Sequence, residues 1–147
     1  MTNKDLPLGE IVLRKYEKPY DGNEREIIKK ISLSLGLLQP GDSRDIIIEL
    51  LRVLITNQRT KKVMSSEELC KEVIKLRETE GLMMRGIAES NIRRQLKRLQ
   101  DMMIIDKKDN TYHLSEHETL KEIFANKYER FLIPQTIERI KEYLEKI

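Results

Sequence analysis

The segment from residue 46 to residue 55 is the feature that most constrains how this chain can fold. It reads Ile-Ile-Ile-Glu-Leu-Leu-Arg-Val-Leu-Ile, so a helix there is apolar on nearly every side. Such a helix belongs where other elements cover it on more than one side. We therefore expect a helix from about Ser43 to Asn57, with Asp42 or Ser43 as its N-cap, at the centre of the core.

Helical periodicity appears on both sides of this central segment. A helix is expected from Asn23 to about residue 38, where Pro40 ends it. Residues 65–68, Ser-Ser-Glu-Glu, have capping-box spacing and predict a helix that stops near Gly81. Ser90 is expected to cap the next helix, which carries a narrow apolar stripe. The stripe is formed by Ile92, Leu96, Leu99 and Met103.

A β-hairpin and two more helices are expected after that stripe. Residues 104–106 and 111–114 indicate strands around the turn 107–110, and residues 63–64 could add a very short strand. Ser115 and Glu118 have capping-box spacing. They predict a helix that buries Leu120, Ile123, Phe124 and Phe131 and is interrupted by Pro134. The last helix places Ile137, Ile140, Leu144 and Ile147 on one side.

Two segments resemble known proteins. Residues 88–99, Ala-Glu-Ser-Asn-Ile-Arg-Arg-Gln-Leu-Lys-Arg-Leu, followed by Ile-Ile-Asp at 104–106 and the hairpin, resemble the recognition helix and wing of winged helix-turn-helix transcriptional regulators. Residues 33–45 resemble a small group of archaeal predicted transcriptional regulators. The resemblance implies a mainly α fold with a small β-hairpin wing: a winged helix-turn-helix with additional N- and C-terminal helices.

Three parts of the chain follow from this interpretation. Residues 1–42 form an N-terminal arm and helix, residues 43–115 the DNA-binding domain, and residues 116–147 C-terminal helices that could serve in dimerisation. The chain is expected to be a homodimer, because the terminal helices carry more apolar surface than a winged domain needs. The alternative is that these helices complete the core of a monomer.

Positive charge is concentrated where the recognition helix is expected. The whole chain carries a net charge of +3, yet residues 85–98 contain five Lys/Arg and only Glu89 as an acid. Such a cluster is the pattern of a nucleic-acid contact, although most charged helix faces are simply solvated. The candidates for base contact are Asn91, Arg94, Gln95 and Arg98. The candidates for phosphate contact are Arg85, Ser90, Arg93, Lys97, Lys107 and Lys108.

The sequence therefore favours sequence-specific binding of double-stranded DNA by a transcriptional regulator. The alternative is a winged-helix adaptor that binds proteins within a transcription or other nucleic-acid assembly. No catalytic constellation stands out, so neither an enzyme nor a cofactor is expected.

Other site types find little support in the residues. Cys70 is the only cysteine, which excludes an internal disulfide and a cysteine-based zinc site, and we expect it to be a buried structural residue. His113 and His117, with Glu116, lack a third clear metal ligand, so no metal is expected. The absence of a leader-like start or a long apolar run predicts a cytoplasmic protein without a membrane partner.

Overall fold

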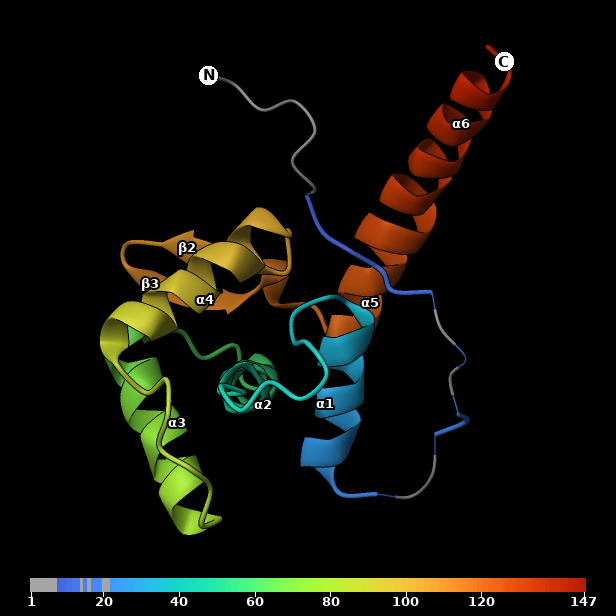
Figure 1. Cartoon of the computed structure of the whole chain (residues 1–147). Helices are drawn as coiled ribbons and strands as arrows, with labels where there is room; N and C mark the ends of the chain where they lie inside the picture. Colours follow the sequence, from blue (N-terminus) through green and yellow to red (C-terminus); the bar gives the residue numbers. More distant parts are fainter. Residues whose placement is uncertain (1–7, 14, 16, 20–21) are drawn as a thin grey trace.

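The fold is organised around the helix α2 (Ile47–Gln58). The computed structural model describes residues 8–13, 15, 17–19 and 22–147. Figure 1 shows α2 nearly end-on between α1 (Glu24–Ser34) and α3 (Ser66–Thr79). Ile48, Leu50 and Leu54 of α2 are fully buried, which confirms that the apolar segment is the centre of the core.

α2 begins four residues later than the sequence predicted. Asp42 does not cap the helix; its Oδ1 accepts a hydrogen bond from Arg44 N at 2.9 Å and closes a local turn instead. Ile46, at the end of this turn, is only 1% exposed. The turn therefore adds a core side chain outside the helix.

α1 packs against α2, so residues 23–38 contribute to the same core as the segments that follow. Asn23 caps α1 through a bond from Glu26 N to its Oδ1 at 2.9 Å. The helix ends at Ser34 rather than near residue 38, because Gly36 adopts a φ of 68° and reverses the chain. Leu37 and Leu38 are buried beyond this turn.

α3 and α4 follow in the expected order. The capping box at β1 (Met64–Ser65) is confirmed: Ser65 Oγ accepts from Glu68 N, and Glu68 Oε1 accepts from Ser65 N, both at 3.1 Å. The prediction that Ser90 caps α4 (Glu89–Asp101) was wrong. The N-cap is Ala88, whose backbone is extended and whose side chain makes no capping bond.

A small antiparallel sheet closes one side of this helical core. β2 (Ile105–Lys108) and β3 (Thr111–Leu114) form a hairpin, and β1 pairs with β3, so the order is β1-β3-β2. The predicted turn 107–110 was too long, because Lys107 and Lys108 pair with Tyr112 and Thr111 and extend β2. Asp109 and Asn110 have φ values of 50° and 63°. Positive φ at both central residues is what a two-residue hairpin turn with the right strand twist requires.

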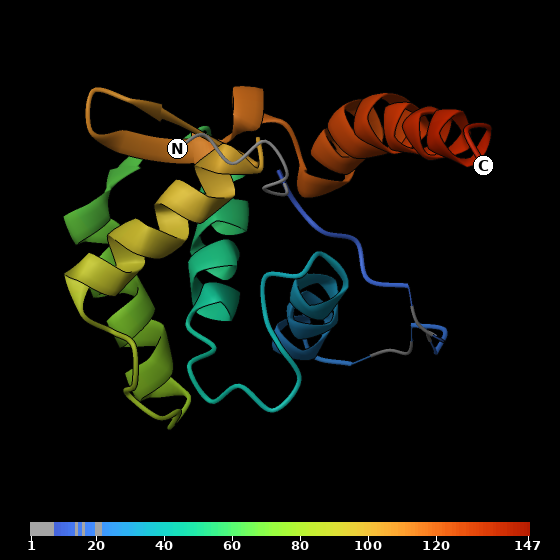
Figure 2. The ribbon, with the colours of Figure 1, turned by 45° about the horizontal axis from the view of Figure 1, so that its top comes forward.

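The C-terminal helix is longer and more continuous than expected. After the short turn η1 (Ser115–His117) it runs through α5 (Leu120–Ile123), the π-helical segment η2 (Phe124–Leu132) and α6 (Ile133–Leu144). Figures 1 and 2 show α6 projecting away from the rest of the fold.

Three predictions about this helix were wrong. Thr119 caps it instead of Ser115, accepting a bond from Glu122 N at 3.2 Å. Pro134 does not interrupt it, because Pro134 lies in the first turn of α6 directly after the π-helical segment. Phe131 is 50% exposed rather than buried.

A buried charge cluster ties α1, α2 and α3 together. Glu49 of α2 is 0% exposed and accepts from Arg77 Nη1 of α3 at 2.6 Å and from Arg25 Nε of α1 at 3.0 Å. Asp45 accepts from Arg77 at 3.0 Å and from Arg25 at 2.8 Å. Burial alone would raise the pKa of Asp45, but the bonds and charges of Arg25 and Arg77 outweigh it and lower that pKa.

Arg77 also fixes the loop that leads into α4. Its Nε donates to the carbonyl oxygen of Met83 at 2.7 Å, and its Nη2 donates to the same oxygen. The buried arginine thus joins the carboxylates of α2 to the α3–α4 connection.

We predict that Arg77→Ala lowers the free energy of unfolding by about 3–5 kcal/mol, because it removes the nearest partner of the buried Glu49 carboxylate and leaves it only Arg25 and Arg52. Urea denaturation followed by circular dichroism measures this change. Lys75→Ala, an exposed substitution on the same helix, is the control and should change stability by less than about 0.5 kcal/mol. Equal small effects of both substitutions would contradict the structural role of Arg77.

Candidate nucleic-acid interface

α4 divides cleanly into a buried and an exposed side. Ile92, Leu96 and Leu99 are each 0% exposed, which confirms the predicted apolar stripe over these three residues. Met103 does not belong to it, because α4 ends at Asp101 and Met103 has a φ of 63° in the turn that follows. Arg94 and Lys97 are exposed on the opposite side. The same helix is therefore fixed by its packing while it presents positive charge outward.

Two of the cations on this face pair with acids one turn away. Arg93 Nη1 lies 2.6 Å from Glu89 Oε1, and Lys97 Nζ lies 2.9 Å from Asp101 Oδ1. The side chains of Arg93 and Lys97 remain 55% and 69% exposed. Exposed pairs of this kind are weak, typically below about 1 kcal/mol. Both cations can therefore exchange their intramolecular acid for a stronger anionic partner.

Arg98 bonds the backbone of another segment rather than an acid on α4. Its Nη1 donates to the carbonyl oxygen of Leu37 at 2.9 Å, and its Nη2 donates to that of Gly36. These carbonyls belong to the turn that follows α1. The guanidinium therefore connects α4 to α1, a role that the basic pattern in the sequence did not reveal.

Asn91 and Gln95 are half-buried in the first half of α4. Asn91 Nδ2 donates to the carbonyl oxygen of Gly86 at 2.8 Å, and its Oδ1 accepts from Gln95 Nε2 at 3.5 Å. Gly86 has a φ of 78°, and a Cβ there would lie 3.0 Å from Asn91 Nδ2. Asn91 thus holds the α3–α4 loop in a turn that only glycine fits easily.

The other predicted contact residues lie around this face. Ser90 is exposed in the first turn of α4, and Arg85 Nη1 lies 3.5 Å from Ser43 Oγ. Lys107 and Lys108 are exposed at the end of β2, in the hairpin that lies beside α4 (Figure 2). Lys107 Nζ lies 5.8 Å from the centre of the Tyr112 ring, a cation–π distance.

The N-terminal arm reaches the C-terminal half of the same face. Leu8, Gly9 and Glu10 line a hollow of about 330 Å³ together with Arg94, Lys97 and Arg98. The lack of periodicity in the arm gave no signal for this placement. The first half of α4 is therefore the more open part of the basic face.

Tyr128 anchors the other side of the C-terminal end of α4. Its hydroxyl donates to the carbonyl oxygen of Met102 at 2.7 Å, and burial raises its pKa to about 12. It therefore keeps its proton, and the bond, at neutral pH.

The side chains of Cys70, His113 and His117 contact neighbouring residues of the fold. Cys70 Sγ lies 3.2 Å from the carbonyl oxygen of Ile87, and burial raises the pKa of its thiol. The rings of His113 and His117 stack at 3.9 Å, and burial together with the charges of His113 and Lys61 lowers the pKa of His117. Within the residues described, no three His, Cys, Asp or Glu side chains are grouped to hold a metal ion.

Comparison of the chain with protein-family models, curated proteins and solved structures gives no match. None of the helices in the described part of the chain has the length and apolar character needed to span a bilayer.

We predict that Arg98→Ala lowers the free energy of unfolding by about 1.5–3 kcal/mol, because it removes hydrogen bonds from a charged donor to two carbonyls. Arg94→Ala is the matched control on the same exposed face and should change stability by less than about 0.5 kcal/mol. Thermal or urea denaturation compares the two variants. Equal free energies of unfolding for Arg98→Ala and Arg94→Ala would show that the bonds between Arg98 and the turn after α1 do not stabilise the fold.

Proposed function

We propose that this chain is a winged helix-turn-helix protein that binds double-stranded DNA as a transcriptional regulator. The element order α2-β1-α3-α4-β2-β3 and the sheet order β1-β3-β2 support this proposal, since this order of helices and strands is the one expected of a winged helix. α4 would be the recognition helix, and the β2–β3 hairpin would be the wing.

The observation that carries the proposal is the division of α4. A helix that enters a major groove about 12 Å wide must be held on one side and free of the fold on the other. The buried stripe holds α4, and its other side presents exposed cations. At 13 residues, α4 is about 20 Å long, enough to follow the groove across several base pairs.

We assign the proposed DNA contacts from the exposure of each side chain. Arg94 is the candidate for base contact, because it is exposed on the open face and can bond guanine O6 and N7 together. The phosphate contacts are assigned to exposed side chains that surround it: Arg85, Ser90, Arg93, Lys97, Lys107 and Lys108. Arg98, Asn91 and Gln95 act as positioning residues, since their side chains bond within the protein.

We predict that duplex DNA binding weakens as salt rises. Arg94→Ala/Lys97→Ala should reduce the slope of log K against log salt by roughly 0.9 for each phosphate that the variant no longer neutralises. Fluorescence anisotropy with a random-sequence duplex measures this slope. Arg139→Ala/Lys146→Ala removes the same charge from the C-terminal helix and should leave the slope unchanged. Absence of binding at low salt, or equal losses of affinity in both variants, would contradict the proposal and favour the adaptor alternative.

We further propose that α6 forms a two-fold dimer interface. Residues 133, 137, 140, 144 and 147 are apolar at alternating spacings of four and three, which is the heptad pattern of paired helices. Ile137, Ile140 and Leu144 are 47%, 54% and 59% exposed. The stripe is exposed on a helix that projects from the fold (Figure 1), and a second copy would cover it with an identical stripe.

The charges of α6 also favour pairing with an identical helix. Arg139 lies 3.1 Å from Glu142, and Lys141 lies 3.7 Å from Glu138, so the charges beside the stripe are balanced within each copy. A dimer would allow two recognition helices to enter major grooves about 34–36 Å apart.

We predict that Ile140→Asp converts a dimer into a monomer, because two carboxylates would face each other in an apolar seam. Sedimentation velocity measures the oligomeric state. Gln135→Asp, on the opposite side of α6, is the control and should remain dimeric. A monomeric wild type, or a dimeric Ile140→Asp, would contradict this interface.

A further inference from the structure

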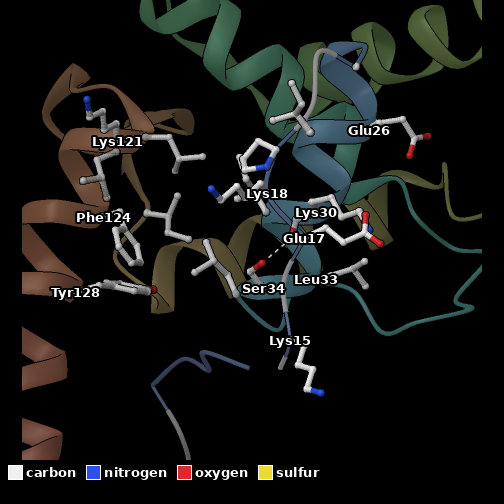
Figure 3. A pocket seen from close by; sticks show the side chains of 18 residues that line it. Lys15, Glu17, Lys18, Glu26, Lys30, Leu33, Ser34, Lys121, Phe124 and Tyr128 are labelled. Carbon is white, nitrogen blue, oxygen red and sulfur yellow. Dashed lines mark hydrogen bonds between the residues drawn. The ribbon is translucent and has the colours of Figure 1, made fainter. Parts of the chain in front are cut away.

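A cavity of about 770 Å³ lies on the side of the fold that α4 does not use. One wall is α1, and the other is the helix formed by α5 and η2 (Figure 3). The arm contributes Lys15, Glu17, Lys18, Pro19 and Gly22 to the lining. This volume lies within the range of about 300–1,000 Å³ that small-molecule sites occupy.

The walls of the cavity are apolar. α1 and the turn after it contribute Ile27, Ile31 and Leu35, while the opposite helix contributes Phe124 and the ring of Tyr128, both labelled in Figure 3. Ile104, the residue just before β2, lines it as well. Only an apolar ligand body gains from displacing water from such walls.

Lysines outnumber carboxylates in the lining of the cavity. Lys15, Lys18, Lys30 and Lys121 belong to it and are exposed. Figure 3 shows the Lys18 side chain reaching into the space between the two walls, whereas those of Lys15 and Lys121 are directed away from it. Two carboxylates, those of Glu17 and Glu26, also belong to the lining, and Figure 3 shows that of Glu26 directed away from the cavity. The balance of charge favours an anionic head group.

From this combination we infer that the cavity is a binding site for an amphipathic anion, an acyl chain or comparable apolar body with a carboxylate head. The apolar body would lie between Ile31 and Phe124, and the head group would meet Lys18, which reaches between the two walls.

Both walls are joined by hydrogen bonds to the C-terminal end of α4. The end of α1 receives the guanidinium of Arg98 at Gly36 and Leu37. The opposite wall bonds through the Tyr128 hydroxyl to the carbonyl oxygen of Met102, at 2.7 Å. A ligand that changes the separation of the walls therefore acts on α4 from two sides. An effect of the ligand on DNA affinity rests on the proposed function. Binding of the ligand to the cavity does not depend on that proposal.

The binding test uses the fluorescent acyl carboxylate cis-parinaric acid with the full chain. Competitors are laurate, kept below its micelle concentration, and dodecanol, kept below its solubility limit in water. Saturable binding is expected at one probe per chain, with laurate displacing the probe more effectively than the uncharged alcohol. Ser34→Phe fills the cavity from α1 and should weaken binding by at least about tenfold.

A charge variant keeps this test independent of how well Ser34→Phe folds. Lys18→Glu should weaken laurate binding by about tenfold, whereas Lys75→Glu, the same change away from the cavity, should not. No saturable probe binding, equal displacement by laurate and dodecanol, or equal effects of the two charge variants would overturn the site.

The link to α4 is tested by amide hydrogen exchange, which needs no DNA. Laurate should change the exchange rates of residues 98–102 in the wild type and leave them unchanged in Arg98→Ala/Tyr128→Phe, which removes both bonds. Unchanged exchange in the laurate-bound wild type would overturn the link. Failure of DNA binding alone would leave both of these results standing and would count only against the proposed function.

Discussion

The buried carboxylate of Glu49 is the constraint on which the arrangement of helices depends. A carboxylate with no exposure must be paired, and its partners come from α1 through Arg25 and from α3 through Arg77. Because Arg77 also holds the Met83 carbonyl, the same cluster fixes the loop that places α4. The cluster thus links the centre of the core to the position of the basic face.

The two ends of α4 are held by different means, and this matters for function. At its start, Asn91 bonds Gly86 in the loop, and at its end Arg98 and Tyr128 bond backbone carbonyls on either side. Arg93 and Lys97, exposed between these anchors, pair only weakly with acids on the same helix. The cavity between α1 and η2 lies on the side of these C-terminal anchors away from the basic face, so a ligand there would act on α4 without contacting its exposed cations.

Local sequence patterns predicted much of this fold, because they depend on neighbours within a few residues. The capping box at Ser65, the apolar stripe of α4 and the turn at Asp109-Asn110 all formed as expected. What the sequence could not show depends on partners far along the chain. Arg77 looks like an ordinary surface arginine until Glu49, 28 residues earlier, is placed beside it, and Arg98 was assigned to base contact because Gly36 is 62 residues away. Pro134 suggested a break, but the π-helical turn before it let the helix continue.

We propose that the exposed face of α4 and the end of the β2–β3 hairpin contact duplex DNA. Titration of the isotope-labelled full chain with a short duplex, followed by amide chemical shifts in NMR spectra, tests this contact. We expect the largest shifts at residues 90–97 and at Lys107 and Lys108, with small changes in α3 and α6. Shifts confined to α6 or to the cavity walls, or no shifts at low salt, would rule the contact out.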